Sequence, residues 1–178
     1  MRRYHSPKDY LDAARDPATP ADELRLLASS VYDFVRLAVA EHPHTEAHVL
    51  VGLIPQRIES WHEQRLAYAL ARRSNMPAQA LSILAERLPP LLNRGRNRGN
   101  GFQAGIALCN HPDTPIDAIQ TMLAKASVST DFRRALAREA TRVDVLLLLL
   151  NDPSVVVQKR ARERLTTWEH ESGANNIV

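Results

Sequence analysis

Residues 16–22 read DPATPAD, and residues 111–117 read HPDTPID. A fragment of the same motif, HPHT, occupies residues 42–45. Self-similarity at intervals of tens of residues is typical of proteins built from stacked supersecondary units, each of which buries its apolar face against its neighbours. The motif therefore predicts a repeat architecture.

The repeated motif also has the composition of a helix start. Thr19 is followed by Pro20 and then, two residues later, by Asp22. A threonine at the N-cap accepts hydrogen bonds from free backbone amides, proline suits the first helical position, and a carboxylate favours the positive end of a helix. Thr114 stands in the same context in the second copy. We expect both threonines to cap helices through bonds from backbone amides.

Apolar residues recur at helical spacing after each expected helix start. The residues expected to be equivalent and buried are Leu24, Leu27, Leu50, Leu53, Leu81, Leu84, Ile119 and Met122. A second helix is expected after each of these, so that residues 16–165 form about five helical hairpins. Residues 6–15 are expected to form a capping helix, and residues 171–178, which have no apolar stripe, are expected to fray. The predicted fold is all-α, in one domain.

Composition favours helices and excludes several classes of protein. Aromatic residues make up 5% of the chain, the formal net charge is +3, and Cys109 is the one cysteine. A single cysteine cannot form an internal disulfide, and the longest apolar block, residues 145–150, is far shorter than the ~20 residues that span a bilayer. No apolar run of signal-peptide length follows the N-terminus. We therefore expect a cytoplasmic protein without a membrane-spanning segment.

The turn motif, the leucines at fixed offsets in the first helix and the stretch VRLAVA at residues 35–40 in the second resemble the leucine-rich repeat variant family of bacterial repeat proteins. Residues 152–161, DPSVVVQKRA, are more similar to a HEAT repeat. The resemblance covers about residues 16–165 and implies a right-handed α-α superhelix, a short α-solenoid. It implies no activity, because solenoids host many functions. The founding member's iron–sulfur module needs clustered cysteines, which this chain lacks, so no cofactor is expected.

Residues 93–101, NRGRNRGNG, interrupt the third hairpin. Arginine offers paired donors to phosphate or carboxylate oxygens, and Arg94, Arg96 and Arg98 stand together on this glycine-rich loop. Two interpretations remain open. The loop either binds phosphates or an acidic partner surface, or it is a solvated connection that only lengthens the link between two helices.

A series of basic residues recurs on the expected second helices. It comprises Arg36, Arg65, Arg134, Arg138 one turn further on, and the Lys159–Arg160 pair. In stacked hairpins the second helices commonly line the inner surface, so the series predicts a ladder that faces an acidic partner. Asp33 and Asp131, however, each stand three residues before an arginine, a spacing that favours ion pairs on one helix face. The spacing therefore favours structural pairing, with the partner-binding ladder as the alternative.

Four histidines invite comparison with a metal site. His44 and His48 are four residues apart, but His42 and His111 occupy the same place in the repeated turn, and no cysteine or carboxylate stands at ligand spacing. We interpret them as turn residues and expect no metal. Residues 146–150 are apolar on all sides of a helix, which indicates either a helix covered on several sides or a self-association surface.

Three functions from different classes remain. The leading hypothesis is a non-enzymatic module that binds a protein or peptide on the curved surface of the array, because the chain shows an architecture and no catalytic set. The alternative is nucleic-acid binding through the arginine loop and series, since residues 87–178 hold 13 basic and 9 acidic side chains. The third is a HEAT-like DNA alkylpurine glycosylase, for which Trp61 and Trp168 are the two tryptophans.

Overall fold

The computed structural model describes residues 4–93 and 99–174, and the regular structure of this part is entirely helical, with no strand. Its α-helices are α1 (Pro7–Arg15), α2 (Ala21–Leu27), α3 (Asp33–Glu41), α4 (Ala47–Gly52), α5 (Trp61–Ala71), α6 (Ala78–Arg87), α7 (Asn100–Asn110), α8 (Ile116–Leu123), α9 (Thr130–Glu139), α10 (Val143–Leu149) and α11 (Val155–Ala174), and a 3-10 helix, η1, spans Pro89–Leu91. The predicted all-α class is confirmed.

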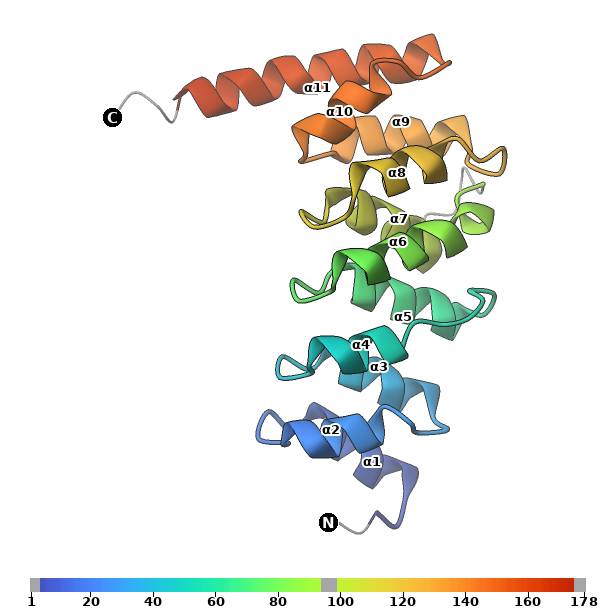
Figure 1. Ribbon diagram of the computed structural model, residues 1–178, viewed down its shortest axis with the longest axis vertical. Coiled ribbons are helices and arrows are strands. Elements are labelled where there is room, and N and C mark those ends of the chain that lie inside the picture. Colours follow the sequence, from blue (N-terminus) through green and yellow to red (C-terminus); the bar gives the residue numbers. More distant parts are fainter. Residues whose placement is uncertain (1–3, 94–98, 175–178) are drawn as a thin grey trace.

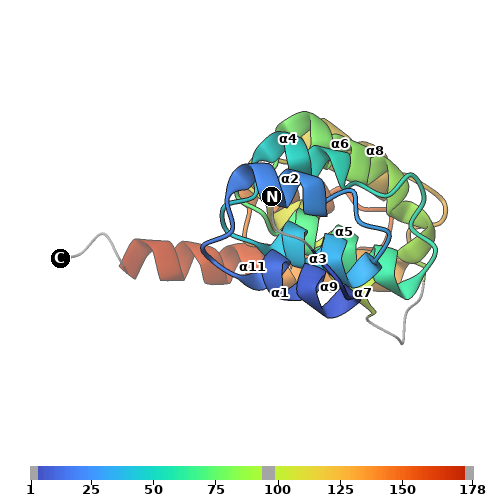
Figure 2. The ribbon, with the colours of Figure 1, turned by 90° about the horizontal axis from the view of Figure 1, so that it is seen from below.

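The helices stack in two layers (Figure 1). In the odd-numbered layer α1 packs on α3, and the contacts continue through α5, α7 and α9 to α11. The even-numbered helices form the second layer, in which α6 packs on α8 and α8 on α10. Seen from below, the C-terminal part of α11 projects beyond the rest of the molecule (Figure 2). Helices close in the sequence are therefore close in space along the whole stack.

Equivalent apolar residues fill the space between the layers. All of the residues predicted to be buried are buried: Leu24, Leu27, Leu50, Leu53, Leu81, Leu84, Ile119 and Met122. Between α7 and α9 an aromatic side chain packs directly on a glycine. A Cβ atom on Gly105 would lie 2.9 Å from the ring of Phe132, which packs edge-on against Phe102 with ring centroids 5.0 Å apart. Glycine at this position leaves room for the ring of Phe132.

Several helix ends differ from the predicted ones. Helix α3 begins at Asp33 instead of Val31, and Val31 is exposed because it lies in the preceding connection. Helix α11 continues to Ala174, so residues 171–174, predicted to fray, are helical. The helix needs no apolar stripe there, because its first turns are packed on α9 and α10 and the later turns extend an established helix. Residues 175–178 lie outside the described part.

The two edges of the stack are built differently (Figure 1). At one edge, which we call the turn edge, odd-numbered helices turn into even-numbered ones through residues 16–20, 42–46, 72–77, 111–115 and 140–142. At the other edge, which we call the loop edge, the connections are residues 28–32, 53–60, 88–99, 124–129 and 150–154. Within the third of these, residues 94–98 lie outside the described part. The turn edge is on the left of Figure 1 and the loop edge on the right.

The threonines of the turn edge do not cap the following helices, and that prediction is wrong. The hydroxyl of Thr19 donates to the carbonyl oxygen of Ala13 (2.6 Å), and the hydroxyl of Thr114 donates to that of Leu108 (2.7 Å). The N-caps of α2 and α8 are the prolines that follow, and neither has a side-chain capping bond. Each threonine is buried beside the last turn of the preceding helix, where the acceptor carbonyl already takes the amide three residues later and also accepts the hydroxyl proton. Thr45 does the same, toward Val39.

Histidines join neighbouring turns. Nε2 of His42 lies 3.0 Å from the carbonyl oxygen of Asp16, and Nε2 of His111 lies 2.8 Å from that of Arg73. Nδ1 of each ring accepts a bond from the backbone amide two residues later. Because Nδ1 accepts, the proton is on Nε2, which donates to the preceding turn. The interpretation of His42 and His111 as turn residues is confirmed.

Arginine side chains continue these links from turn to turn. Arg73 donates to the carbonyl oxygens of His42 (2.9 Å) and Pro43 (3.1 Å). Arg142 donates to those of His111 (2.7 Å) and Thr114 (2.7 Å). Each turn after the first is thus bonded to the backbone of the turn before it, which fixes the spacing of the helix pairs.

Candidate functional site

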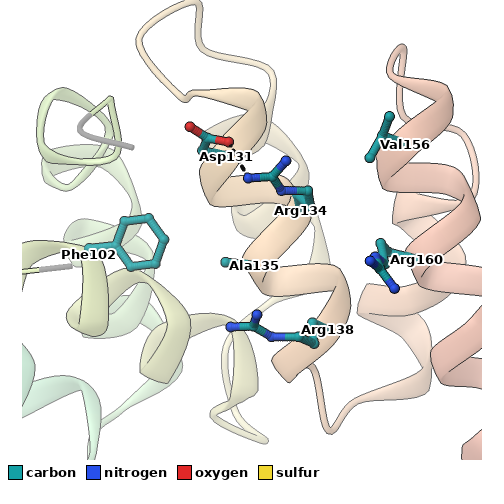
Figure 3. Close-up of a pocket in the computed structure, with 7 residues that line it drawn as sticks. All are labelled: Phe102, Asp131, Arg134, Ala135, Arg138, Val156 and Arg160. Carbon is teal, nitrogen blue, oxygen red and sulfur yellow. Dashed lines mark hydrogen bonds and ion pairs between the residues drawn. The ribbon is translucent and has the colours of Figure 1, made fainter. Parts of the chain in front are cut away.

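A groove of about 370 Å³ crosses the odd-numbered layer where α7, α9 and α11 lie side by side (Figure 3). Its lining residues are Phe102 from α7, Asp131, Arg134, Ala135 and Arg138 from α9, and Val156 and Arg160 from α11. We call it the arginine groove. It brings together two predicted site residues, Arg134 and Arg138, with the basic residue Arg160 of the same predicted series.

The amphipathic pattern of α9 places the two arginines of that helix. Phe132 and Leu136 are buried, whereas Arg134 and Arg138, which are four residues apart, lie on the exposed face. The helix begins after Ser129, whose hydroxyl oxygen accepts a bond from the amide of Phe132 and donates to a carbonyl oxygen of the loop edge. The face that carries the arginines is therefore fixed at the start of the helix.

A buried ion pair fixes the other wall of the groove. Nε of Arg133 lies 2.7 Å from Oδ2 of Asp152, and both side chains are largely buried. Asp152 also accepts the amide of Ser154 at Oδ1 (2.8 Å) and the side chain of Gln158 at its carbonyl oxygen (2.7 Å). These bonds attach the first turn of α11 to α9, so Val156 and Arg160 face the groove.

Each arginine of the groove has a carboxylate partner on its own helix. The pairs are Arg134–Asp131 (2.7 Å), Arg138–Glu139 (2.5 Å) and Arg160–Glu163 (2.8 Å). More than half of each arginine side chain is exposed. Exposed ion pairs contribute only about 0.2–1 kcal/mol each, so a bound partner can replace these carboxylates at small cost.

The other predicted arginines lie elsewhere. Arg36 pairs with Asp33 on α3, as the spacing predicted, and lines a separate groove beside the loop-edge residues 28–30 and 53–57. The guanidinium carbon of Arg65 lies 4.9 Å from the ring centroid of Trp61, a cation–π contact. The remaining predicted site residues, Arg94, Arg96 and Arg98, lie outside the described residues.

Sequence reasoning did not identify Phe102, Ala135 or Val156 as site residues. The signal for Val156 was present, because Val157 and Ala161 form the buried stripe of α11 and leave Val156 on the outer face. No local signal identifies Phe102, which lines the groove only because α7 and α9 are neighbours in the odd-numbered layer.

The two tryptophans do not belong to the arginine groove. Trp61 lies on α5 and Trp168 on α11, and α7 and α9 separate these helices in the odd-numbered layer. Cys109 is fully buried on α7, and burial raises the pKa of its thiol to about 12. The structure therefore places it as a small core residue.

Two further findings hold for residues 4–93 and 99–174. No group of three or more His, Cys, Asp or Glu side chains is arranged to hold a metal ion. None of the helices combines the length and hydropathy needed to cross a membrane.

Comparison of the chain with protein-family models, curated proteins and solved structures gave no match.

Proposed function

We propose that this chain is a non-enzymatic interaction module that binds a protein or peptide in the arginine groove. We infer that its helix pairs form a short right-handed α-α superhelix similar to leucine-rich repeat variant and HEAT-like solenoids. The observation that carries the proposal is that three consecutive helices of one layer, α7, α9 and α11, jointly line the groove. Stacked repeats use such continuous surfaces to bind extended partners.

The lining of the groove favours a protein partner over a nucleic acid. Phe102, Ala135 and Val156 give it an apolar part, and Asp131 stands beside Arg134. These apolar side chains suit the mixed polar and apolar side chains of a peptide better than a phosphate backbone. Single-stranded nucleic acids also use exposed aromatic rings as stacking platforms, whereas Phe102 is buried.

Peptide selection with groove-blocking variants tests the proposed function. Peptides from a random library are selected on the immobilised wild-type protein, and their affinities are measured by fluorescence polarisation. Val156→Trp fills the groove, whereas Val155→Trp adds the same bulk to an exposed neighbour that does not line it. We expect Val156→Trp to weaken binding at least about tenfold and Val155→Trp to leave it nearly unchanged, because only the first occupies the contact surface. Equal binding to both variants contradicts the proposal.

A salt titration tests nucleic-acid binding separately. Each arginine–phosphate contact releases counterions, so a binding loop made of Arg94, Arg96 and Arg98 would give a steep salt dependence that the triple alanine variant flattens by up to about 3 units. We expect weak binding of labelled oligonucleotides that does not depend on these arginines. Tight, salt-sensitive binding that the triple variant abolishes would support the nucleic-acid alternative.

A further inference from the structure

The spacing of the groove arginines matches an extended peptide. Arg134 and Arg138 follow one another along α9 at an i, i+4 spacing, which corresponds to about 6 Å along a helix axis. In an extended chain, side chains on the same side recur every two residues, at about 6.6 Å. Two acidic side chains at i and i+2 of such a peptide can therefore each face one of these arginines.

The second wall of the groove supplies a third cation and an apolar contact. Arg160 and Val156 are one turn apart on α11 and face α9 across the groove (Figure 3). Val156 is half exposed although it is a large apolar residue. A partner that pairs with Arg160 can therefore also bury an apolar side chain against Val156.

The charges of the groove favour carboxylates as the partner's groups. The lining holds three arginines and one carboxylate, Asp131. Glu139 and Glu163, which pair with Arg138 and Arg160, do not line the groove. A carboxylate arriving in the groove forms charge-assisted bonds to a guanidinium from the open side, and the displaced glutamates return to water without becoming buried.

We propose that the arginine groove binds an acidic peptide segment in an extended conformation. Carboxylates at i and i+2 of the segment pair with Arg134 and Arg138, and a further carboxylate pairs with Arg160. An apolar side chain next to this acidic run packs against Val156. This inference rests on the proposed function and specifies the chemistry of the partner.

Designed peptides test the inference. Two labelled peptides of twelve residues share a leucine beside an alternating run, in which every second residue is glutamate in one peptide and glutamine in the other. Fluorescence polarisation measures both against the wild type and against the variant Arg134→Gln, Arg138→Gln, Arg160→Gln. The matched control is Arg25→Gln, Arg57→Gln, Arg72→Gln, which removes the same charge from exposed arginines outside the groove. Circular dichroism and thermal unfolding establish that the variants fold.

We expect the glutamate peptide to bind at least about tenfold more tightly than the glutamine peptide, and the groove variant to remove that difference. The control variant should retain it, apart from a small loss through the change in net charge. A third peptide carries lysine at every position where the first carries glutamate. The charge-reversal variant Arg134→Glu, Arg138→Glu, Arg160→Glu should bind this lysine peptide in preference to the glutamate peptide. This last result does not depend on the stability of the glutamine variant.

Other outcomes overturn the inference. Equal affinity for the glutamate and glutamine peptides, both blocked by Val156→Trp, removes the acidic specificity and leaves the proposed interaction function standing. If neither Val156→Trp nor the groove variant weakens binding of the glutamate peptide, both the proposed function and the acidic specificity are contradicted. Preferential binding of an oligonucleotide that the groove variant abolishes replaces the acidic peptide by a nucleic acid.

Discussion

At the turn edge the same chemical solution recurs from one helix pair to the next, whereas at the loop edge each connection has its own. His42, Arg73 and His111 stand at the same place in successive turns, and each donates to the backbone of the preceding turn. At the loop edge the contacts have no such repetition. Arg87 donates to Pro55 (2.5 Å), and Arg133 pairs with Asp152.

The two edges also treat helix ends differently. Of the helices that begin at the loop edge, α1, α5 and α9 are each capped by a serine that accepts a backbone amide at N3, whereas α3 and α7 have no side-chain cap. Helices that begin at the turn edge, such as α2 and α8, have proline at the N-cap without a side-chain bond. There the threonine hydroxyl serves the preceding helix. Turns of nearly constant length allow the same set of hydrogen bonds to recur at the turn edge. Connections of varied length at the loop edge each need different hydrogen bonds.

Leu81→Ala should have the largest effect, because Leu81 lies in the core that both edges enclose. Removing a fully buried leucine side chain loses its transfer free energy and leaves a cavity, so the free energy of unfolding should fall by about 2–5 kcal/mol. Urea denaturation followed by circular dichroism measures the change. A loss much below this range would mean that the layers are not packed around this position.

Asp152→Ala tests the loop edge. The substitution leaves the guanidinium of Arg133 buried with only the carbonyl of Val128 and the hydroxyl of Thr130 as partners, and a loss of about 3 kcal/mol is expected. Removing both charges, with Arg133→Met and Asp152→Ala together, should cost less than Asp152→Ala alone. The double variant therefore distinguishes an unpaired charge from a general packing defect.

His111→Phe tests the turn edge. The ring keeps its area but loses the bonds to the carbonyl of Arg73 and from the amide of Asp113, both of which then lack that partner. We expect a loss of about 2 kcal/mol in urea denaturation. The matched control is His48→Phe, because His48 is exposed on α4 and its substitution should change the stability by less than about 0.5 kcal/mol. Similar effects at both histidines would contradict the turn-edge links.

Thr114→Val removes the hydroxyl with little change of shape and should cost about 1 kcal/mol, because the carbonyl oxygen of Leu108 loses one of its two donors and keeps only the amide of His111. Thr114→Ser keeps the donor and should cost less. Ser60→Ala at the loop edge should cost a similar amount, about 1 kcal/mol, for the opposite reason, since there the amide of Glu63 loses its acceptor. Thermal unfolding of the three variants compares the edges directly.

The native thiol of Cys109 reports on local opening of the structure without any added label. It lies on α7 next to the turn 111–115. Burial keeps its thiol protonated, with a pKa raised from 9.0 to about 12, so a thiol reagent at mildly alkaline pH should react only when the structure opens. The folded state then binds the proton more tightly than the unfolded state, so this contribution to stability is complete below pH 9 and declines as the pH rises from 9 toward 12. His111→Phe should accelerate the reaction with the reagent more than Asp152→Ala does. The reverse order would mean that Cys109 becomes exposed through global unfolding, which Asp152→Ala should promote more than His111→Phe does.

Much of the fold was predictable because it depends on local spacing. The helical periodicity of Leu24 and Leu27 recurs at Leu81 and Leu84, and all four are buried. The ion pair of Asp131 with Arg134 also followed from its i, i+3 spacing. The direction of the threonine bonds did not follow, because a hydroxyl is both donor and acceptor and only its surroundings decide which role it takes.

The sequence by itself determined the helical class, the positions of the turns and the apolar residues that fill the core, since each is set by residues within a few positions of one another. Only the tertiary structure decided which groups meet across turns. His111, for example, bonds to a carbonyl oxygen 38 residues earlier. It also decided that Arg134 and Arg138 share a groove with Arg160 while Arg36 and Arg65 do not. Such contacts depend on how whole helices pack, and the distance between two helices in space is not encoded at any single position of either one.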